Sequence, residues 1–168
     1  MIIFLIGLMG AGKTTLGKTL ANKLKYKFYD LDDEIETAEK QSIAHFFHQY
    51  GEAEFRKVER HHLEKLVEQL SKKNAIIACG GGTPCHLNTI EYLNKNGITI
   101  YLEVPIEELV NRLSNKEKDR PLLINSGLHS ILTTLFENRY PFYNQAQFTL
   151  SGNNLTVKDI LSKITIIK

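Results

Sequence analysis

The sequence has few cysteines, little net charge and no long apolar run. Its only two cysteines, Cys79 and Cys85, are separated by five residues, and no second Cys/His pair stands at the spacing of a zinc finger. Lys and Arg number 21 and Asp and Glu number 19, so the net charge of +2 argues against a nucleic-acid-binding protein. The apolar N-terminal segment is far shorter than the roughly 20 residues that a membrane span needs, and it lacks the features of a signal peptide.

These absences favour a cytoplasmic protein that acts on small molecules and whose two thiols are buried and inert. A metal site at Cys79, Cys85 and the adjacent His86 is the weaker alternative. The chain has 168 residues, of which 42% are hydrophobic, and this is enough for one domain with a core of its own.

Short apolar runs alternate along the chain with stretches that mostly predict helices. The predicted strands are residues 2–6, 27–31, 75–79, 98–102 and 147–150. Because runs such as IIFLI and AIIAC are apolar without alternation, we expect parallel strands that are covered on both faces. The predicted fold class is therefore α/β, a doubly wound parallel sheet of about five strands with helices on both faces.

Apolar residues three and four positions apart predict an amphipathic helix over residues 52–70. Residues 15–24 and 106–113 also predict helices. Ser126 should begin a further helix that ends near Arg139, because Pro141 cannot continue it. Between the last two helices, the polar segment SNKEKDRPLLIN (114–125) predicts a mobile loop.

The segment GLMGAGKT follows the first predicted strand and matches the pattern G-x-x-x-x-G-K-[ST]. In such a loop the backbone N–H groups turn around a phosphate, and the following helix adds the positive end of its dipole. Lys13 can reach the β- and γ-phosphates, and Thr14 can offer its hydroxyl to Mg²⁺. An ordinary glycine-rich turn would not explain the Lys-Thr pair in this register, so we predict a nucleotide site.

Two further features follow predicted strands, at the carboxyl edge where an open parallel sheet binds its ligands. Asp30 and Asp32 are two apart and should point to the same side of an extended chain; one could hold a Mg²⁺-bound water and the other a substrate hydroxyl. Alternatively, the aspartates cap a helix that begins near Asp33. The glycines at 80–82 would allow close approach of a ligand and positive φ, or would only form a tight turn before a helix starting near Leu87.

The motifs, in their order along nearly the whole chain, resemble those of the shikimate kinases, which are small P-loop kinases of the nucleoside monophosphate kinase fold. They are the P-loop, DLD, GEAEFRKVE, GGG, DRPLL and RYPFY. The resemblance implies transfer of the ATP γ-phosphoryl group to the 3-hydroxyl of shikimate, giving 3-phosphoshikimate and ADP in aromatic amino-acid biosynthesis. It implies Mg²⁺ as cofactor. The small net charge and the short apolar run predict no nucleic-acid or membrane partner, and nothing in the sequence demands more than a monomer. It also implies a single kinase domain over residues 1–168, with a substrate-binding helical region at about 32–60 and a mobile lid at about 113–125.

The resemblance assigns roles residue by residue. For catalysis it implies Lys13, Asp32 and Arg120, and for the metal Thr14 and Asp30, with Asp30 in the outer shell. For ATP it implies Gly10, Ala11, Gly12, Lys13, Thr14, Thr15, Arg112 and Arg120. For shikimate it implies Asp32, Phe47, Phe55, Arg56, Gly80, Gly81, Gly82 and Arg139.

The two arginines of this set, Arg56 and Arg139, would hold the carboxylate of shikimate, and Glu59 could hold Arg56 in place. This makes chemical sense because the planar guanidinium fork matches a carboxylate, which lysine cannot do. Without the resemblance, Arg56 on a helix would be taken for a solvated surface charge.

Two other functions compete with this interpretation. A gluconate or nucleoside monophosphate kinase shares the P-loop and the lid, but a nucleotide acceptor does not call for two arginines on one carboxylate. A GTPase switch would need D-x-x-G and N-K-x-D segments, and NKNG and NKEK both fail at the last position. The chain departs from the family at Cys79, where a smaller or apolar residue is usual, and at SGNNLTV (151–157), which lacks the usual arginine or proline. There, Asn153 and Asn154 would offer only backbone contacts to adenine.

Overall fold

The computed structural model describes the backbone of residues 1–114 and 121–164 and the side chains of residues 1–114 and 127–164. Its centre is a sheet of five parallel strands in the order β2-β3-β1-β4-β5. The strands are β1 (Ile2–Ile6), β2 (Lys27–Asp30), β3 (Ala75–Ala78), β4 (Ile98–Glu103) and β5 (Phe148–Ser151). Each lies within one residue of the prediction at either end, and the α/β fold class is confirmed.

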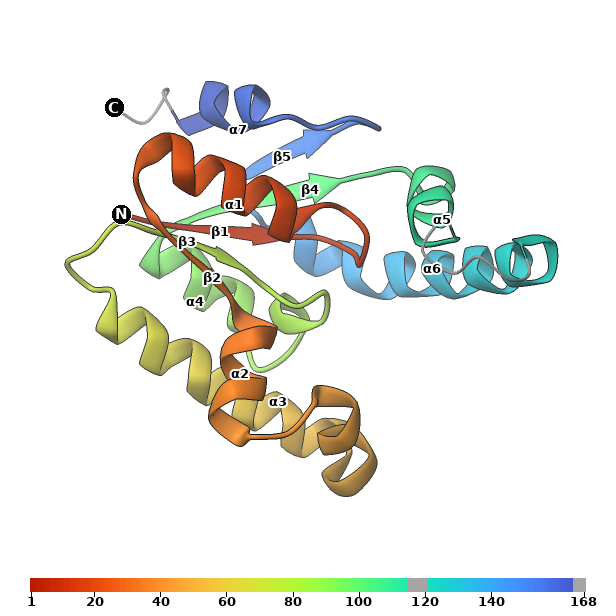
Figure 1. Cartoon of the computed structure of the whole chain (residues 1–168), viewed down its shortest axis with the longest axis horizontal. Helices are drawn as coiled ribbons and strands as arrows, with labels where there is room; N and C mark the ends of the chain where they lie inside the picture. The colour runs from red at the N-terminus through yellow and green to blue at the C-terminus, as the bar shows by residue number, and fades with distance from the viewer. Residues whose placement is uncertain (115–120, 165–168) are drawn as a thin grey trace.

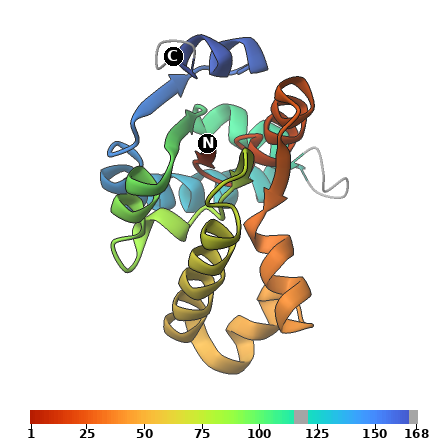
Figure 2. The same ribbon diagram turned by 90° about the vertical axis from the view of Figure 1, so that its left-hand side faces the viewer.

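Helices cover both faces of the sheet, which explains why the central strands are apolar throughout. They are α1 (Lys13–Leu24), α2 (Leu31–Glu39), α3 (Ile43–Gln69), α4 (Thr89–Asn96), α5 (Ile106–Ser114), α6 (Pro121–Tyr143) and α7 (Val157–Ile164). Helices α1 and α7 lie on one side of the sheet, and α3 and α4 lie on the other (Figures 1 and 2). Every residue of β1 and β3 is therefore buried, as expected for parallel strands between two helical layers.

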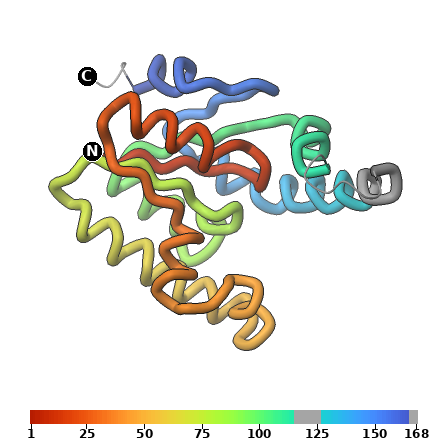
Figure 3. Tube along the Cα trace, viewed as in Figure 1, coloured from red at the N-terminus to blue at the C-terminus, as the bar shows by residue number. Residues whose placement is uncertain are grey.

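Helices α2 and α3 extend beyond the sheet as a pair that pack against each other (Figure 3). The predicted amphipathic helix forms the second part of α3. The first part, residues 43–50, is separated from it by Gly51, whose φ of 79° and ψ of 171° are not helical. A positive φ of this kind favours glycine, so Gly51 fixes the direction change at which Glu52 and the second part of α3 begin.

Helix α6 differs from the prediction at both ends. It begins at Pro121 rather than Ser126, so residues 121–125 are helical and not loop, and proline suits a first helical position because its missing N–H would be unpaired there anyway. It also continues past Pro141 to Tyr143. Tyr143 is fully buried, its ring stacks on Tyr101 with centroids 5.0 Å apart, and its hydroxyl donates to the carbonyl of Gly81. These tertiary contacts hold the last turn although proline removes one helical hydrogen bond.

The connection from α4 to β4 is a point of close backbone packing. A Cβ atom added at Gly97 would lie 2.5 Å from the carbonyl oxygen of Ile2 and 2.8 Å from the ring of Phe4. We expect Gly97→Ala to lower the free energy of unfolding by about 1–3 kcal/mol, because core overpacking forces the neighbours to move. Urea unfolding should show this loss, whereas Gly127→Ala, where an added Cβ meets nothing within 4 Å, should leave stability unchanged or slightly raised.

Within residues 1–114 and 121–164, none of the helices combines the length and the apolar character that a membrane span requires.

Candidate active site

The predicted phosphate loop connects β1 to α1 at the carboxyl edge of the sheet. Gly10 and Gly12 adopt φ values of 79° and 93°, which glycine tolerates and other residues rarely do. Gly12 is the N-cap residue of α1, and no side chain caps this helix end. The backbone N–H groups of the first turn are therefore available to an anion, which the helix dipole also favours.

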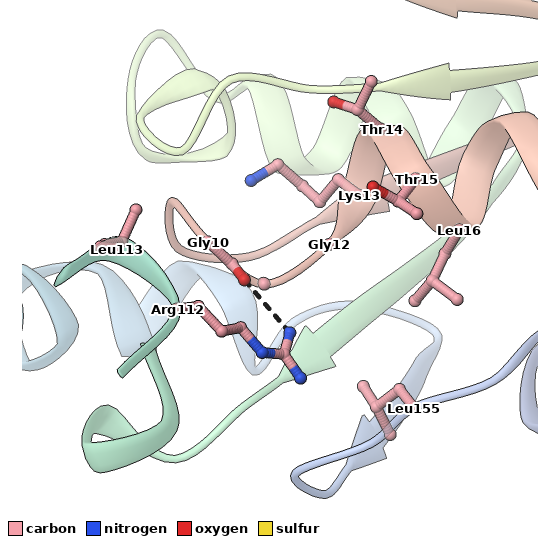
Figure 4. A pocket seen from close by; sticks show the side chains of 10 residues that line it. Gly10, Gly12, Lys13, Thr14, Thr15, Leu16, Arg112, Leu113 and Leu155 are labelled. Carbon is pink, nitrogen blue, oxygen red and sulfur yellow. Dashed lines mark hydrogen bonds between the residues drawn. The ribbon is translucent and has the colours of Figure 1, made fainter. Parts of the chain in front are cut away.

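The loop borders a cavity of about 600 Å³ (Figure 4). The residues that line it are Gly10, Ala11, Gly12, Lys13, Thr14, Thr15, Leu16, Arg112, Leu113 and Leu155. All the residues predicted to contact ATP are in this set except Arg120, which lies outside the residues whose side chains are described. The three leucines were not predicted, because no motif marks an apolar wall.

Arg112 joins the phosphate loop to the loop after β5. Its guanidinium donates to the carbonyl of Gly10 at 3.2 Å, to Glu108 at 2.8 Å and to the carbonyl of Asn153. Figure 4 shows this contact with Gly10 among the residues that line the cavity. Arg112 thus positions Leu155 and the 151–157 loop beside the cavity.

Lys13 lies at the opposite side of the loop, near the aspartates. Its ammonium donates to the carbonyls of Gly7 and Leu8, each at 2.9 Å. Burial lowers the pKa of Lys13 to about 8, and the carboxylates of Asp32 and Asp30 oppose this shift. Bound phosphates would add negative charge here and favour the charged ammonium further.

Thr14 and Asp30 lie in contact, since the hydroxyl of Thr14 donates to Asp30 Oδ2 at 2.7 Å. A hydroxyl and a carboxylate beside a phosphate loop are the oxygen donors that suit Mg²⁺, which is usually held by one or two carboxylates together with substrate phosphates. The two residues predicted for the metal therefore fit it in kind and in place.

The capping alternative holds for Asp30, not for Asp33. Asp30 is the N-cap residue of α2, where its side chain accepts a hydrogen bond from Asp32 N at 3.3 Å. Asp32 consequently lies in the first turn of a helix, and the expectation that it continues an extended strand was wrong. Burial raises the pKa of Asp32 to about 6, with further contributions from Asp30 and Glu59, while Lys13 opposes them.

The three positions after β3 need glycine because polar side chains of other residues lie directly against them and leave no room for a Cβ atom. A Cβ atom would lie 2.8 Å from Asp32 Oδ1 if added at Gly80, and 2.9 Å from Arg139 Nη1 if added at Gly81. One added at Gly82 would overlap the guanidinium of Arg56. None of the three has a positive φ, so close approach alone explains the triplet. A short 3-10 helix, Thr83–Cys85, follows it, and α4 begins at Thr89 rather than near Leu87.

Arg56 lies on the second part of α3, where a hydrogen-bonded chain fixes it. Its Nη1 donates to Glu59 Oε2 at 2.9 Å, and the other oxygen of Glu59 accepts from the hydroxyl of Thr83 at 2.6 Å. Glu59 is only 3% exposed, so this ion pair is shielded from water and strongly dependent on both partners. The expected role of Glu59 as a support for Arg56 is thus matched by its position, whereas Thr83 carried no sequence signal.

Phe47 and Phe55 form an aromatic wall beside Arg56. Their ring centroids are 4.6 Å apart, and the guanidinium carbon of Arg56 lies 5.7 Å and 5.3 Å from them. Such distances allow cation–π attraction. Phe55 is only 2% exposed whereas Phe47 is half-buried, so the surface beside Arg56 is formed mainly by Phe47.

Arg139 approaches the same glycines from α6. No carboxylate within the described residues forms an ion pair with Arg139, in contrast to Arg56. Burial raises the pKa of Tyr143, and the nearby Arg139 opposes that shift. The hydroxyl of Tyr143 also donates to the carbonyl of Gly81 at 2.6 Å. Tyr143 therefore lies beside both Arg139 and Gly81.

The two cysteines lie on either side of the glycines. Cys79 is buried, as predicted, and Cys85 is half-buried. Burial raises the pKa of both thiols, that of Cys85 to about 11, so both are protonated and weakly nucleophilic near neutral pH. Among the described residues, no three His, Cys, Asp or Glu side chains gather as metal ligands would.

Comparisons with known proteins point to one family. The shikimate kinase family model matches residues 9–167. A shikimate kinase from Azobacteroides pseudotrichonymphae is 39% identical over 165 residues, which are 96% of this chain and 96% of that protein. The crystal structure of shikimate kinase from Bacteroides thetaiotaomicron has a TM-score of 0.87 at 36% identity, covering 99% of this chain and 97% of that one.

The chain is also similar to a solved structure that contains a ligand. Shikimate kinase from Acinetobacter baumannii, in complex with shikimate, has a TM-score of 0.82 at 35% identity and covers 99% of this chain and 91% of that one. The match to the family model, the identity over nearly the full length and the shared fold all point the same way. The chain therefore belongs to the shikimate kinase family of ATP-dependent phosphotransferases.

Proposed function

We propose that this protein transfers the γ-phosphoryl group of ATP to the 3-hydroxyl of shikimate, forming 3-phosphoshikimate and ADP. The observation that carries the proposal is the convergence of Asp32, Arg56 and Arg139 on the three bare glycines. This surface adjoins the phosphate loop, since a Cβ atom at Gly81 would lie 3.6 Å from the carbonyl of Gly7 and 3.7 Å from Met9 N. An acceptor held there would meet the end of the nucleotide triphosphate.

The acceptor would be bound at two ends. Arg56 and Arg139 would hold its carboxylate with charge-assisted hydrogen bonds. Phe47, which packs against the buried Phe55, would cover its ring. Asp32 would accept a hydrogen bond from the reacting hydroxyl and orient its oxygen toward the phosphate. With a pKa near 6, Asp32 is mostly ionised at neutral pH and can take the proton as the phosphoryl group transfers.

On the nucleotide side, the N–H groups of Gly10, Gly12 and the first turn of α1 would bind the phosphates. Lys13 would leave its loop carbonyls for the β- and γ-phosphate oxygens and offset the charge that develops during transfer. We propose that Thr14 binds Mg²⁺ directly and that Asp30 binds it through water. The ion supplies charge neutralisation on the phosphates when bound.

The lid remains a prediction from the resemblance, because Arg120 and most of residues 113–125 lie outside the described side chains. We propose that Arg120 contacts the transferred group when the lid covers the site, where water would otherwise be phosphorylated. We propose that the enzyme acts as a monomer. Its use of ATP in biosynthesis suits the cytoplasm.

Acceptor selection tests this proposal. ADP release with Mg²⁺ and ATP should be measured with shikimate, gluconate and a nucleoside monophosphate offered in turn. Of the three acceptors, we expect only shikimate to support turnover, with one molecule of 3-phosphoshikimate formed for each ADP released. Faster turnover with either of the other acceptors, or ADP release without a phosphorylated acceptor, would contradict the proposal.

Thr83 offers a test of how the acceptor arginine is held. We expect Thr83→Val to lower kcat/KM for shikimate by about tenfold while the KM for ATP stays unchanged, because Glu59 loses a buried donor and no longer fixes Arg56. Thr83→Ser keeps the hydroxyl and should restore most of the activity in the same steady-state assay. Normal activity in Thr83→Val together with a loss in Thr83→Ser would mean that the methyl group of Thr83, and not its hydrogen bond, is what the site needs.

A further inference from the structure

Arg56 binds two carboxylates of its own helix. Besides Glu59 on Nη1, Glu52 Oε1 accepts from Nη2 at 2.7 Å and from Nε at 3.2 Å. The guanidinium has a rigid fork of donors, and Glu52 takes the edge formed by Nε and Nη2. An acceptor carboxylate that is to bind this edge of Arg56 must take the place of Glu52.

The two glutamates differ in how firmly they are held. The side chain of Glu59 is 4% exposed and is also bound by Thr83, whereas that of Glu52 is 57% exposed. Displacing Glu59 would leave a buried charge without a partner, which is costly. Glu52 can turn into water at a lower cost, because its own side chain is largely exposed and Arg56 would keep its buried bond to Glu59.

Glu52 also lies near His86 and in the electrostatic field of Arg139. Its pKa is lowered, first by the hydrogen bonds from Arg56, and further by His86 and Arg139. His86 Nε2 is 3.7 Å from Glu52 Oε1. A carboxylate of the protein therefore occupies the electrostatic environment that we assign to the carboxylate of shikimate.

We infer that Glu52 competes with the acceptor carboxylate for Arg56 and thereby tunes the affinity of the site for the acceptor. The inference rests on the proposed function. An acceptor with a carboxylate can replace Glu52 by an equivalent interaction, but a neutral acceptor cannot. Glu52 thus lowers the affinity for an acceptor that must displace it, whereas a neutral acceptor leaves Glu52 on Arg56 and does not bear that cost.

A purely structural role for Glu52 makes a different prediction. Because Gly51 interrupts α3, Glu52 is the first residue of the second helical part, where a negative charge favours the positive end of the helix dipole. In that case, removing the charge would lower the stability of the helix without changing the relative binding of charged and neutral acceptors.

The variant Glu52→Gln distinguishes competition for Arg56 from a purely structural role, and Glu54→Gln is its matched control. Glu54 lies on the same helix and pairs with the exposed Lys57. Its replacement by glutamine removes the same charge as Glu52→Gln but leaves Arg56 untouched. We expect Glu52→Gln to bind shikimate about two- to fivefold more tightly by titration calorimetry, as the loss of an exposed competing charge pair allows. The KM for shikimate should fall in parallel while kcat stays within about twofold, and Glu54→Gln should match the wild type.

The carboxamide of shikimate is the second arm of the experiment. Glu52→Gln should not tighten its binding, because a neutral amide does not exchange with Glu52. Unchanged or weaker shikimate binding by Glu52→Gln, or equal gains for shikimate and its carboxamide, would overturn the inference while an active wild type still upheld the proposed function. A wild type that does not phosphorylate shikimate would overturn the proposed function itself, and this inference with it.

Discussion

Replacing Lys13 by alanine should reduce phosphoryl transfer at least about 100-fold with every acceptor, since it removes a charge that meets the γ-phosphate as the transition state forms. The loss should appear in kcat more than in the KM for shikimate, because Lys13 lies on the nucleotide side of the site. Steady-state ADP release at saturating acceptor measures this effect directly.

A matched control is available on the same helix. Lys18 lies with its ammonium 5.7 Å from the ring centroid of Phe28 and is exposed, so Lys18→Ala makes the same chemical change on α1 away from the loop. It should retain wild-type turnover. Because Lys13 also bonds the carbonyls of Gly7 and Leu8, thermal unfolding of both variants should be compared. A folded Lys13→Ala protein with normal kcat would contradict the assigned role.

Arg139→Ala should reduce kcat/KM for shikimate by about 30- to 1,000-fold, equivalent to about 2–4 kcal/mol for the loss of charge-assisted contacts. We expect this loss to exceed that of Arg56→Ala. The charge of Arg56 is already offset by Glu59 and Glu52, whereas Arg139 forms no ion pair among the described residues. Removing Arg139 therefore takes away more of the positive potential at the glycines.

The double variant should lose less than the sum of the two single losses in free energy, since both arginines would hold one carboxylate. Arg139→Lys keeps the charge but not the planar fork, and we expect it to recover only part of the activity. The KM for ATP should change little in all three variants. A loss confined to the KM for ATP would place Arg139 at the nucleotide instead.

Much of the fold was predictable because its signals are local. A run of apolar residues defined each strand, and the register of Gly12, Lys13 and Thr14 after the first strand defined the phosphate loop. The end of α6 was not predictable in this way. The rule that proline ends a helix is outweighed there by the burial of Tyr143 and its bond to Gly81, and neither contact can be read from neighbouring residues.

The site shows the same division. The family motifs predicted that Asp32, Arg56, Arg139 and the glycines belong to one site, and the structure places these residues close together. Their local geometry was less accessible, because Asp32 belongs to a helix capped by Asp30 and the glycines need no positive φ. Thr83 and Glu52 were missed since their importance arises only from which side chains they touch. The role of Arg120 stays a prediction.

The central claim is that Arg139 and Arg56 hold the carboxylate of the acceptor beside the three glycines. The most direct test measures kcat/KM for shikimate and for its carboxamide with both the wild type and Arg139→Ala. We predict that the wild type handles the carboxamide poorly, that Arg139→Ala handles shikimate poorly, and that the variant is hardly worse than the wild type with the carboxamide. An equally large loss with both acceptors would contradict the claim, because Arg139 would then act on something other than the carboxylate.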